Sequence, residues 1–252
     1  MAILARLLCR IGAVCLRVVL CAGPLAPVLA AETASDARTN DRPSAFSVPP
    51  AVLQAASQAA LPLFQQYCAG CHGGDARGMR SKGAPNLVDG VWLWDDASIE
   101  TPLAALEDTI RYGIRSGHPK ARNVAVMPAF GGGGEVTLTA AEISDVVEYV
   151  RALAGQAVET AARKRGRAVF TGRGNCSECH SDDGSGNADW GAPDLRVKED
   201  SAWLYGADRV SLTRSVAGGR AGRCPDWSTK LDAPAIHALA LWLRAGNVGA
   251  PR

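Results

Sequence analysis

Residues 68–72 read Cys-Ala-Gly-Cys-His, and residues 176–180 read Cys-Ser-Glu-Cys-His. Each pentapeptide places two thiols one helical turn apart, with an imidazole directly after the second thiol. Such thiols can form thioethers with the two vinyl groups of haem, and the histidine then binds the iron. The pattern therefore predicts two covalently attached c-type haems. The predicted haem cysteines are Cys68, Cys71, Cys176 and Cys179, and the predicted iron ligands next to them are His72 and His180.

Two other kinds of site use paired cysteines, and the sequence argues against both. A zinc site would need further cysteine or histidine ligands in each half, and the chain has only 4 histidines. A thioredoxin-like dithiol needs a βαβ setting, but the period-two alternation that is typical of strands is missing. Haem is therefore the predicted cofactor at both motifs.

The two motifs lie within a duplicated segment. Residues 67–87 and 175–195 align without a gap, and each copy closes with an apolar stripe of helical period, at 141–155 and 233–246. These features predict an all-α fold of two tandem cytochrome c domains, each of which binds one covalent haem. The predicted segments are a signal peptide at 1–30, a disordered leader at 31–50, and the two domains at 51–156 and 157–252.

The first thirty residues have the pattern of a secretory signal. They carry three arginines and no acid, then an apolar run that ends in small residues. An uncleaved membrane anchor is the alternative, but Arg17, Pro24 and Pro27 interrupt the apolar run. We therefore expect a periplasmic protein without a membrane span after cleavage, associated with the membrane only through a partner.

The charge balance bears on the kind of partner. Without the signal the chain is nearly neutral, so nothing indicates nucleic-acid binding. The first copy has an excess of acidic residues and the second an excess of basic residues. This opposite bias predicts docking of different redox proteins, such as a dehydrogenase, a small cytochrome or an oxidase, on the two copies.

Two prolines and two arginines are further candidates for contact with haem. Pro85 and Pro193 follow their histidines at the same distance, and each carbonyl is the predicted acceptor for the second ring nitrogen. A rigid turn explains these prolines equally well. Arg115 and Arg220 each follow an apolar helical segment and are predicted to pair with haem propionates, with an exposed surface position as the alternative.

The sixth iron ligand differs between the copies. Met127, in the segment before the first closing helix, is the predicted ligand of the first haem, because His/Met ligation is typical of electron-transfer cytochromes. Met79 is the alternative, although a packing position in its loop explains it better. The second copy has no methionine, and Cys224-Pro225 stands where Met127 and its proline stand in the first copy.

Three interpretations of Cys224 remain open. Its thiolate binds the iron opposite His180, or it lies near that haem unbound, or it is buried or paired with another molecule. A thiolate ligand would stabilise ferric iron and give the second haem the lower potential. The other two histidines, His118 and His237, are predicted to lie on the surface.

The order of these features resembles the di-haem cytochrome c subunit of cbb-type haem-copper oxidases, over roughly residues 55–246. The matching motifs are CAGCH, GAPNL, SGHPKARNVAVMPAFG, CSECH, GAPDL, WLYG and GGRAGR. The resemblance implies electron transfer from soluble donors into an oxidase, and a transmembrane tether. This chain differs in showing no tether beyond the signal and in replacing the second axial methionine by Cys224. We therefore expect a soluble periplasmic relay of the same domain type.

Three functions follow from these expectations. The leading hypothesis is an electron relay between a dehydrogenase or soluble donor and an oxidase or other acceptor. The second is a haem enzyme of sulfur-compound oxidation, similar to thiosulfate dehydrogenases, in which Cys224 ligates the catalytic haem. The third is a subunit bound within a larger dehydrogenase or oxidase. A di-haem peroxidase is disfavoured, because the second copy offers no distal histidine.

Overall fold

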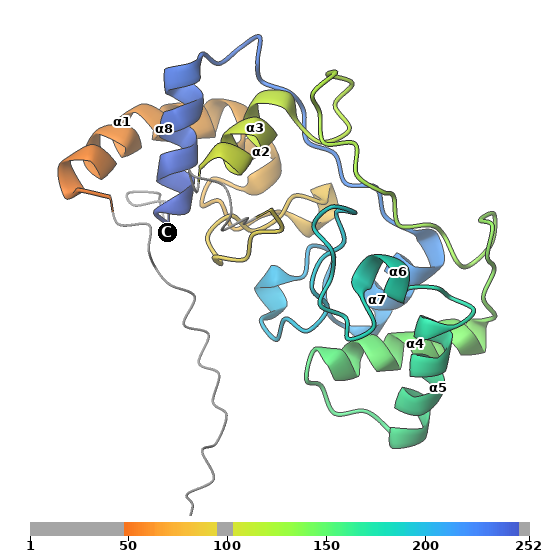
Figure 1. Cartoon of the computed structure of the whole chain (residues 1–252). Coiled ribbons are helices and arrows are strands. Elements are labelled where there is room, and N and C mark those ends of the chain that lie inside the picture. Colours follow the sequence, from red (N-terminus) through yellow and green to blue (C-terminus); the bar gives the residue numbers. More distant parts are fainter. Residues whose placement is uncertain (1–47, 95–102, 247–252) are drawn as a thin grey trace, which may run out of the picture. The chain divides into compact units, whose positions relative to one another are not determined.

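Helices joined by long loops make up residues 48–94 and 103–246, the part of the chain that this computed structural model describes (Figure 1). Within those ranges no strand occurs, and the extended backbone forms only isolated β-bridges. The predicted all-α fold is thereby confirmed. The predicted signal peptide, 1–30, lies outside the described residues. So does most of the predicted leader, whose last residue, Pro50, begins the first helix.

The helices repeat in the same order in the two copies. Each copy has an opening helix, a short motif helix that ends at the motif histidine, a third helix and a closing helix. In the first copy these are α1 (Pro50–Tyr67), α2 (Ala69–His72), α3 (Ala104–Tyr112) and α4 (Ala140–Leu153). In the second they are α5 (Thr160–Thr171), α6 (Ser177–His180), α7 (Arg209–Gly218) and α8 (Ala233–Arg244). The loops contain two 3₁₀ turns, η1 (Arg80–Lys82) and η2 (Asp200–Ala202).

Polar side chains fix where the longer helices begin. At the start of α4, Thr139 Oγ1 accepts a hydrogen bond from the Glu142 N–H at 3.2 Å, and the Glu142 carboxylate accepts one from the Thr139 N–H at 2.8 Å. The carboxylates of Glu159, Asp208 and Asp232 accept backbone N–H groups at the starts of α5, α7 and α8. These bonds satisfy N–H groups that have no partner within the helix.

The long helices pack across the repeat. Closing helix α4 packs on α5, the opening helix of the second copy, and closing helix α8 packs on α1, the opening helix of the first. The third helices follow the same pattern, because α7 contacts α4 and α3 contacts α8. Each packed group therefore combines the opening and third helices of one copy with the closing helix of the other.

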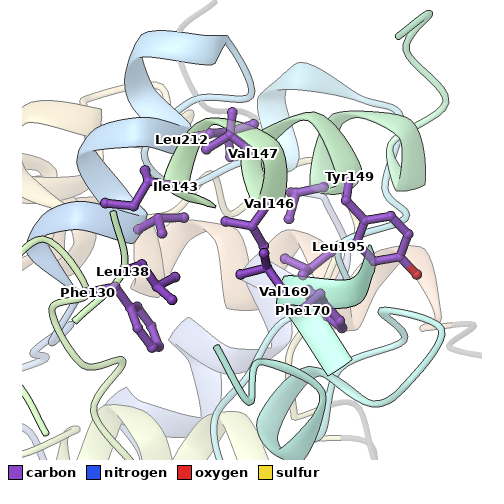
Figure 2. Close-up of a cluster of buried hydrophobic side chains, with 12 residues drawn as sticks. Phe130, Leu138, Ile143, Val146, Val147, Tyr149, Val169, Phe170, Leu195 and Leu212 are labelled. Atoms are coloured by element: carbon purple, nitrogen blue, oxygen red, sulfur yellow. The ribbon is translucent and has the colours of Figure 1, made fainter. Parts of the chain in front are cut away.

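Each packed group has its own apolar core. One core buries Phe64 against Trp242, with ring centroids 5.0 Å apart and both side chains fully buried. The other, drawn in Figure 2, buries Phe170 against Tyr149, with centroids 5.1 Å apart. In this second group a Cβ at Gly166 of α5 would collide with a backbone carbonyl of α4. The close approach of α4 and α5 therefore requires glycine at position 166.

The two packed groups do not coincide with the two sequence copies, residues 51–156 and 157–252. The repeat is visible in the sequence, but α4 and α8 carry similar apolar stripes, so neither stripe identifies its partner. Only residues 154–159 separate α4 from α5. A connection this short favours packing between consecutive helices, which leaves α8 to cover α1.

A double-mutant cycle on the aromatic core tests the exchange of closing helices. Phe64→Leu and Trp242→Leu lie in different copies but remove the same ring contact, so their effects on the free energy of unfolding should be coupled by about 1 kcal/mol. Phe64→Leu and Tyr149→Leu lie in the same copy but in different cores, so their effects should simply add. Denaturant unfolding followed by circular dichroism measures both cycles, and the reverse pattern would contradict the packing.

The capping box of α4 predicts a dependence of stability on pH. Hydrogen bonds from Thr139, first its backbone N–H and then its hydroxyl, hold the pKa of Glu142 below its ordinary value of 4.5, and Arg173 adds to the effect. A depressed pKa stabilises the fold above the ordinary value, and this stabilisation is lost as the pH falls through the lowered pKa. Thermal unfolding between pH 6 and pH 3 should therefore show a smaller loss of stability in Glu142→Gln than in the wild type.

Candidate haem sites

The two motifs have the same backbone geometry. In the first, the opening helix ends at Cys68 and the motif helix α2 follows at once, so that the His72 N–H donates to the Cys68 carbonyl at 2.9 Å. In the second, the His180 N–H donates to the Cys176 carbonyl at 2.9 Å. This single helical turn brings two thiols and an imidazole close together.

The carbonyl of the matched proline orients each motif histidine. Nδ1 of His72 lies 3.0 Å from the Pro85 oxygen, and Nδ1 of His180 lies 3.1 Å from the Pro193 oxygen. An oxygen of this kind can only accept a hydrogen bond, so Nδ1 carries the proton and Nε2 keeps its lone pair. These are the contacts that the equal spacing predicted, and they leave the lone pair of Nε2 free to bind a metal in each ring.

Burial shifts the pKa of both motif histidines and of the first cysteine of each motif. It lowers the pKa of His72 and of His180, against the opposing effect of the proline carbonyls. Burial also raises the pKa of the Cys68 thiol to about 12 and that of Cys176 to about 11. The neutral form of each histidine is therefore favoured, and a neutral imidazole is the form that binds iron.

Cys224 lies at the first motif. A thiolate at Cys224 or at Cys71 would raise the pKa of Cys68, after the larger effect of burial, so the three sulfurs lie near one another. Burial raises the pKa of Cys224 itself to about 11, and Cys71 contributes to that shift as well. The backbone of Cys224 pairs with Ile114, through N–H to oxygen distances of 3.0 and 2.9 Å.

Met127 lies with the second motif. It packs, together with Cys176, against the core of α4, α5 and α7. Its backbone pairs with Arg220 of the second copy, through two N–H to oxygen distances of 3.0 Å. Met127 therefore lies with the motif of His180 and Cys224 with the motif of His72, whereas the sequence led us to expect each in its own copy. The reason is that each sulfur residue precedes a closing helix. Because each closing helix packs on the other copy, the sulfur residue lies in that copy's packed group as well.

The two arginines predicted to bind propionates contact other protein groups. The Arg115 guanidinium donates to the carbonyls of Gly222, Val124 and Ala125 at 2.7, 2.9 and 3.3 Å. Arg220 lies 3.9 Å from the centroid of the Tyr205 ring and donates to Ser215 Oγ at 3.0 Å. Propionate binding stays a prediction for both residues.

The remaining sulfur and histidine candidates, Met79, His118 and His237, make contacts of other kinds. Met79 sits in the loop after α2, where its backbone pairs with Ala84. His118 stacks on Tyr112 with ring centroids 4.8 Å apart. His237 lies on α8 with its Nδ1 2.8 Å from Glu107 Oε1, and more than half of its side chain is exposed.

Two glycines of these sites were missed in the sequence. Gly113 follows α3 with φ of 76°, and a Cβ there would collide with the Cys224 carbonyl. Gly219 follows α7 with φ of 69°, and its Cβ would meet the Met127 carbonyl oxygen at 2.5 Å. The sequence does show a glycine at the same place after both third helices, and this repeat could have identified them. Each glycine lies where the backbone of a segment from the other copy makes a close approach.

These donors fit covalent haem at both motifs. Each motif offers two thiols for the vinyl groups and a free Nε2 for the iron, and a sulfur side chain from a separate segment lies in the same packed group. Among the described residues, no group of three or more His, Cys, Asp or Glu side chains could hold a bare metal ion. The cage that the zinc alternative requires is thus not found in that part of the chain.

No helix within the described ranges is both long enough and apolar enough to cross a membrane.

Known proteins are similar to this chain over most of its length. The family described as cytochrome C oxidase, cbb3-type, subunit III matches residues 55–150 and again residues 161–243. A Bradyrhizobium protein named cbb3-type cytochrome c oxidase subunit FixP is 40% identical over 200 residues, which cover 78% of this chain and 63% of that protein. A Cereibacter sphaeroides protein named cbb3-type cytochrome c oxidase subunit CcoP is 36% identical, over 79% of this chain and 64% of that protein.

The chain thus spans somewhat less than two thirds of the length of the curated relatives it matches. The family match covers both copies and includes both Cys-x-x-Cys-His motifs, together with the segments that carry Met127 and Cys224. The chain belongs to the family of cbb3-type cytochrome c oxidase subunit III.

Proposed function

We propose that this chain is a di-haem c-type cytochrome that relays electrons from a dehydrogenase or soluble donor to an oxidase. The observation that carries the proposal is the double site, in which each motif histidine is oriented by a proline carbonyl and shares its packed group with a sulfur side chain. When bound, haem supplies one-electron chemistry at its iron, and the protein sets its potential and exposure.

The residues have separate roles in this proposal. Cys68 and Cys71 tether one haem, and Cys176 and Cys179 tether the other. His72 and Cys224 would hold the first iron, whereas His180 and Met127 would hold the second. The neutral state of the buried imidazoles supports this assignment, because protons then compete weakly with iron for Nε2.

The two sulfur ligands would make the haems unequal. As a ligand Cys224 would be held as a thiolate, which would donate more electron density than the thioether of Met127. Ferric iron would therefore be favoured at the first motif. In this arrangement the low-potential haem is the one tethered by Cys68 and Cys71, which reverses the order expected from the sequence.

The partners follow from the relatives and from charge. The relatives' names identify oxidase subunits, so we take an oxidase as the acceptor. A dehydrogenase or small cytochrome would serve as donor, and the charge bias between the copies would distinguish the two docking faces. The arginine-rich apolar start of the sequence supports export to the periplasm.

A haem enzyme of sulfur-compound oxidation is the second candidate, and one observation bears on it. A surface hollow at Cys224 is lined by Ser116, Arg223, Pro225 and Asp226. Arg223 could attract an oxyanion, but Asp226 places a negative charge in the same hollow. This mixed charge favours the relay over a site for anionic sulfur substrates.

Removal of one haem at a time tests the ligand pairs. The chain with Cys176→Ala and Cys179→Ala keeps only the first haem and should still show the electron paramagnetic resonance signal of a thiolate-bound ferric haem. The chain with Cys68→Ala and Cys71→Ala keeps only the second and should show a signal of His/Met ligation. Thiolate ligation in the second variant would restore the pairing expected from the sequence.

Replacement of the unusual ligand tests the difference in potential. In the wild type, a redox titration followed at the Soret band should resolve two midpoints. Cys224→Met supplies a neutral sulfur in place of a thiolate, so the lower midpoint should rise toward the upper one, which should stay unchanged. Ser116→Ala changes another residue of the same hollow but removes no ligand, and it should leave both midpoints in place. Overlapping midpoints in the wild type would contradict thiolate ligation.

A further inference from the structure

The two segments that carry the sulfur residues are hydrogen-bonded to residues of the other copy. The connection from α3 to α4 runs alongside the connection from α7 to α8 (Figure 1). Cys224 exchanges two backbone hydrogen bonds with Ile114, and Met127 exchanges two with Arg220. A displacement of either segment therefore disturbs the pairing of the other.

The two halves of this joined region are related by the repeat. Gly113 and Gly219 occupy the same place after their third helices, and each lies directly against the carbonyl of the sulfur residue from the other copy. The two copies differ, however, two residues after these glycines. Arg115, two residues after Gly113, corresponds to Ala221 in the second copy.

Arg115 connects the two sulfur segments through its side chain. Its Nε donates to the Gly222 carbonyl, two residues before Cys224, at 2.7 Å. Its Nη1 donates to the carbonyls of Val124 and Ala125, just before Met127, at 2.9 and 3.3 Å. One half-buried guanidinium thus holds both segments at the same time.

The backbone of Arg115 is held in an uncommon conformation. Its φ is 46°, in the left-handed region that residues with a Cβ rarely adopt. The Arg115 N–H donates to the Arg122 carbonyl at 3.1 Å, which keeps the residue in place. A left-handed residue that is not glycine or asparagine marks a position where the surrounding contacts outweigh the strain.

We propose that Arg115 is a positioning residue that fixes both sulfur ligands, so that loss of its guanidinium loosens the ligation of both haems together. The inference rests on the proposed di-haem function. The planar fork of arginine reaches acceptors on both segments, which a shorter or single donor cannot do. Arg115 would therefore act on the iron sites through the backbone rather than through a propionate.

Imidazole binding to the ferric protein tests this inference. Imidazole can replace a sulfur ligand only while that ligand's segment is displaced, so its apparent affinity reports the displaced fraction at each haem. Arg115→Met keeps an unbranched apolar side chain but removes every donor. It should raise the affinity for imidazole at both haems by roughly tenfold, the change expected when hydrogen bonds of a charged donor are lost. Single-haem variants carrying the same substitution assign the change to each site.

Arg122→Met is the matched control. The Arg122 guanidinium donates to Thr109 Oγ1 at 3.1 Å and to the Ala105 carbonyl at 3.3 Å, both in the first copy. This variant should leave imidazole binding at the Cys224 haem unchanged. Arg115→Gln retains one donor and should give a smaller increase than Arg115→Met. If circular dichroism and haem content show that Arg115→Met does not fold, the imidazole affinity of Arg115→Gln is the test.

The outcomes separate the inference from the proposed function. An increase at only one haem, or at neither, would overturn the positioning role of Arg115. So would an increase of equal size in Arg122→Met at the Cys224 haem. If the wild type showed no sulfur-ligated haem in its electron paramagnetic resonance spectrum, the ligand set itself would fail, and the inference with it.

Discussion

The contact between each closing helix and the opening helix of the other copy determines the rest of the structure. It buries Phe64 against Trp242 in one group and Phe170 against Tyr149 in the other. Because a sulfur residue precedes each closing helix, the same contact places Cys224 beside the first motif and Met127 beside the second. The proposed ligand pairs are thus a consequence of helix packing.

The sequence was sufficient for the parts of each site that are close together in the chain. The motif cysteines, the histidine and its proline carbonyl lie within one short segment, so spacing alone predicted their contacts. The helical stripes likewise predicted the all-α fold. The choice of partner between copies could not be predicted, because α4 and α8 present similar apolar faces and either could cover either opening helix. The sequence therefore singled out Cys224 but did not predict that it lies beside the first motif.

The joined ligand segments add a constraint that neither haem site has alone. Each third helix ends at a glycine that seats the sulfur segment of the other copy. Arg115, which has no counterpart in the second copy, adds a bond to both segments. In the proposed relay this shared framework limits movement of the ligands when the iron changes its charge, and a rigid site needs little reorganisation for electron transfer.

The exchange of closing helices also bears on how the protein is made. The first motif ends at residue 72, yet α8, which covers its opening helix, begins at residue 233. During synthesis from the N-terminus, the apolar face of α1 therefore stays exposed until α8 has been made. Contacts so distant in sequence slow folding. Haem attachment at the first motif would then take place on an open, partly folded chain, whereas the second motif lies close to its covering helix from the start.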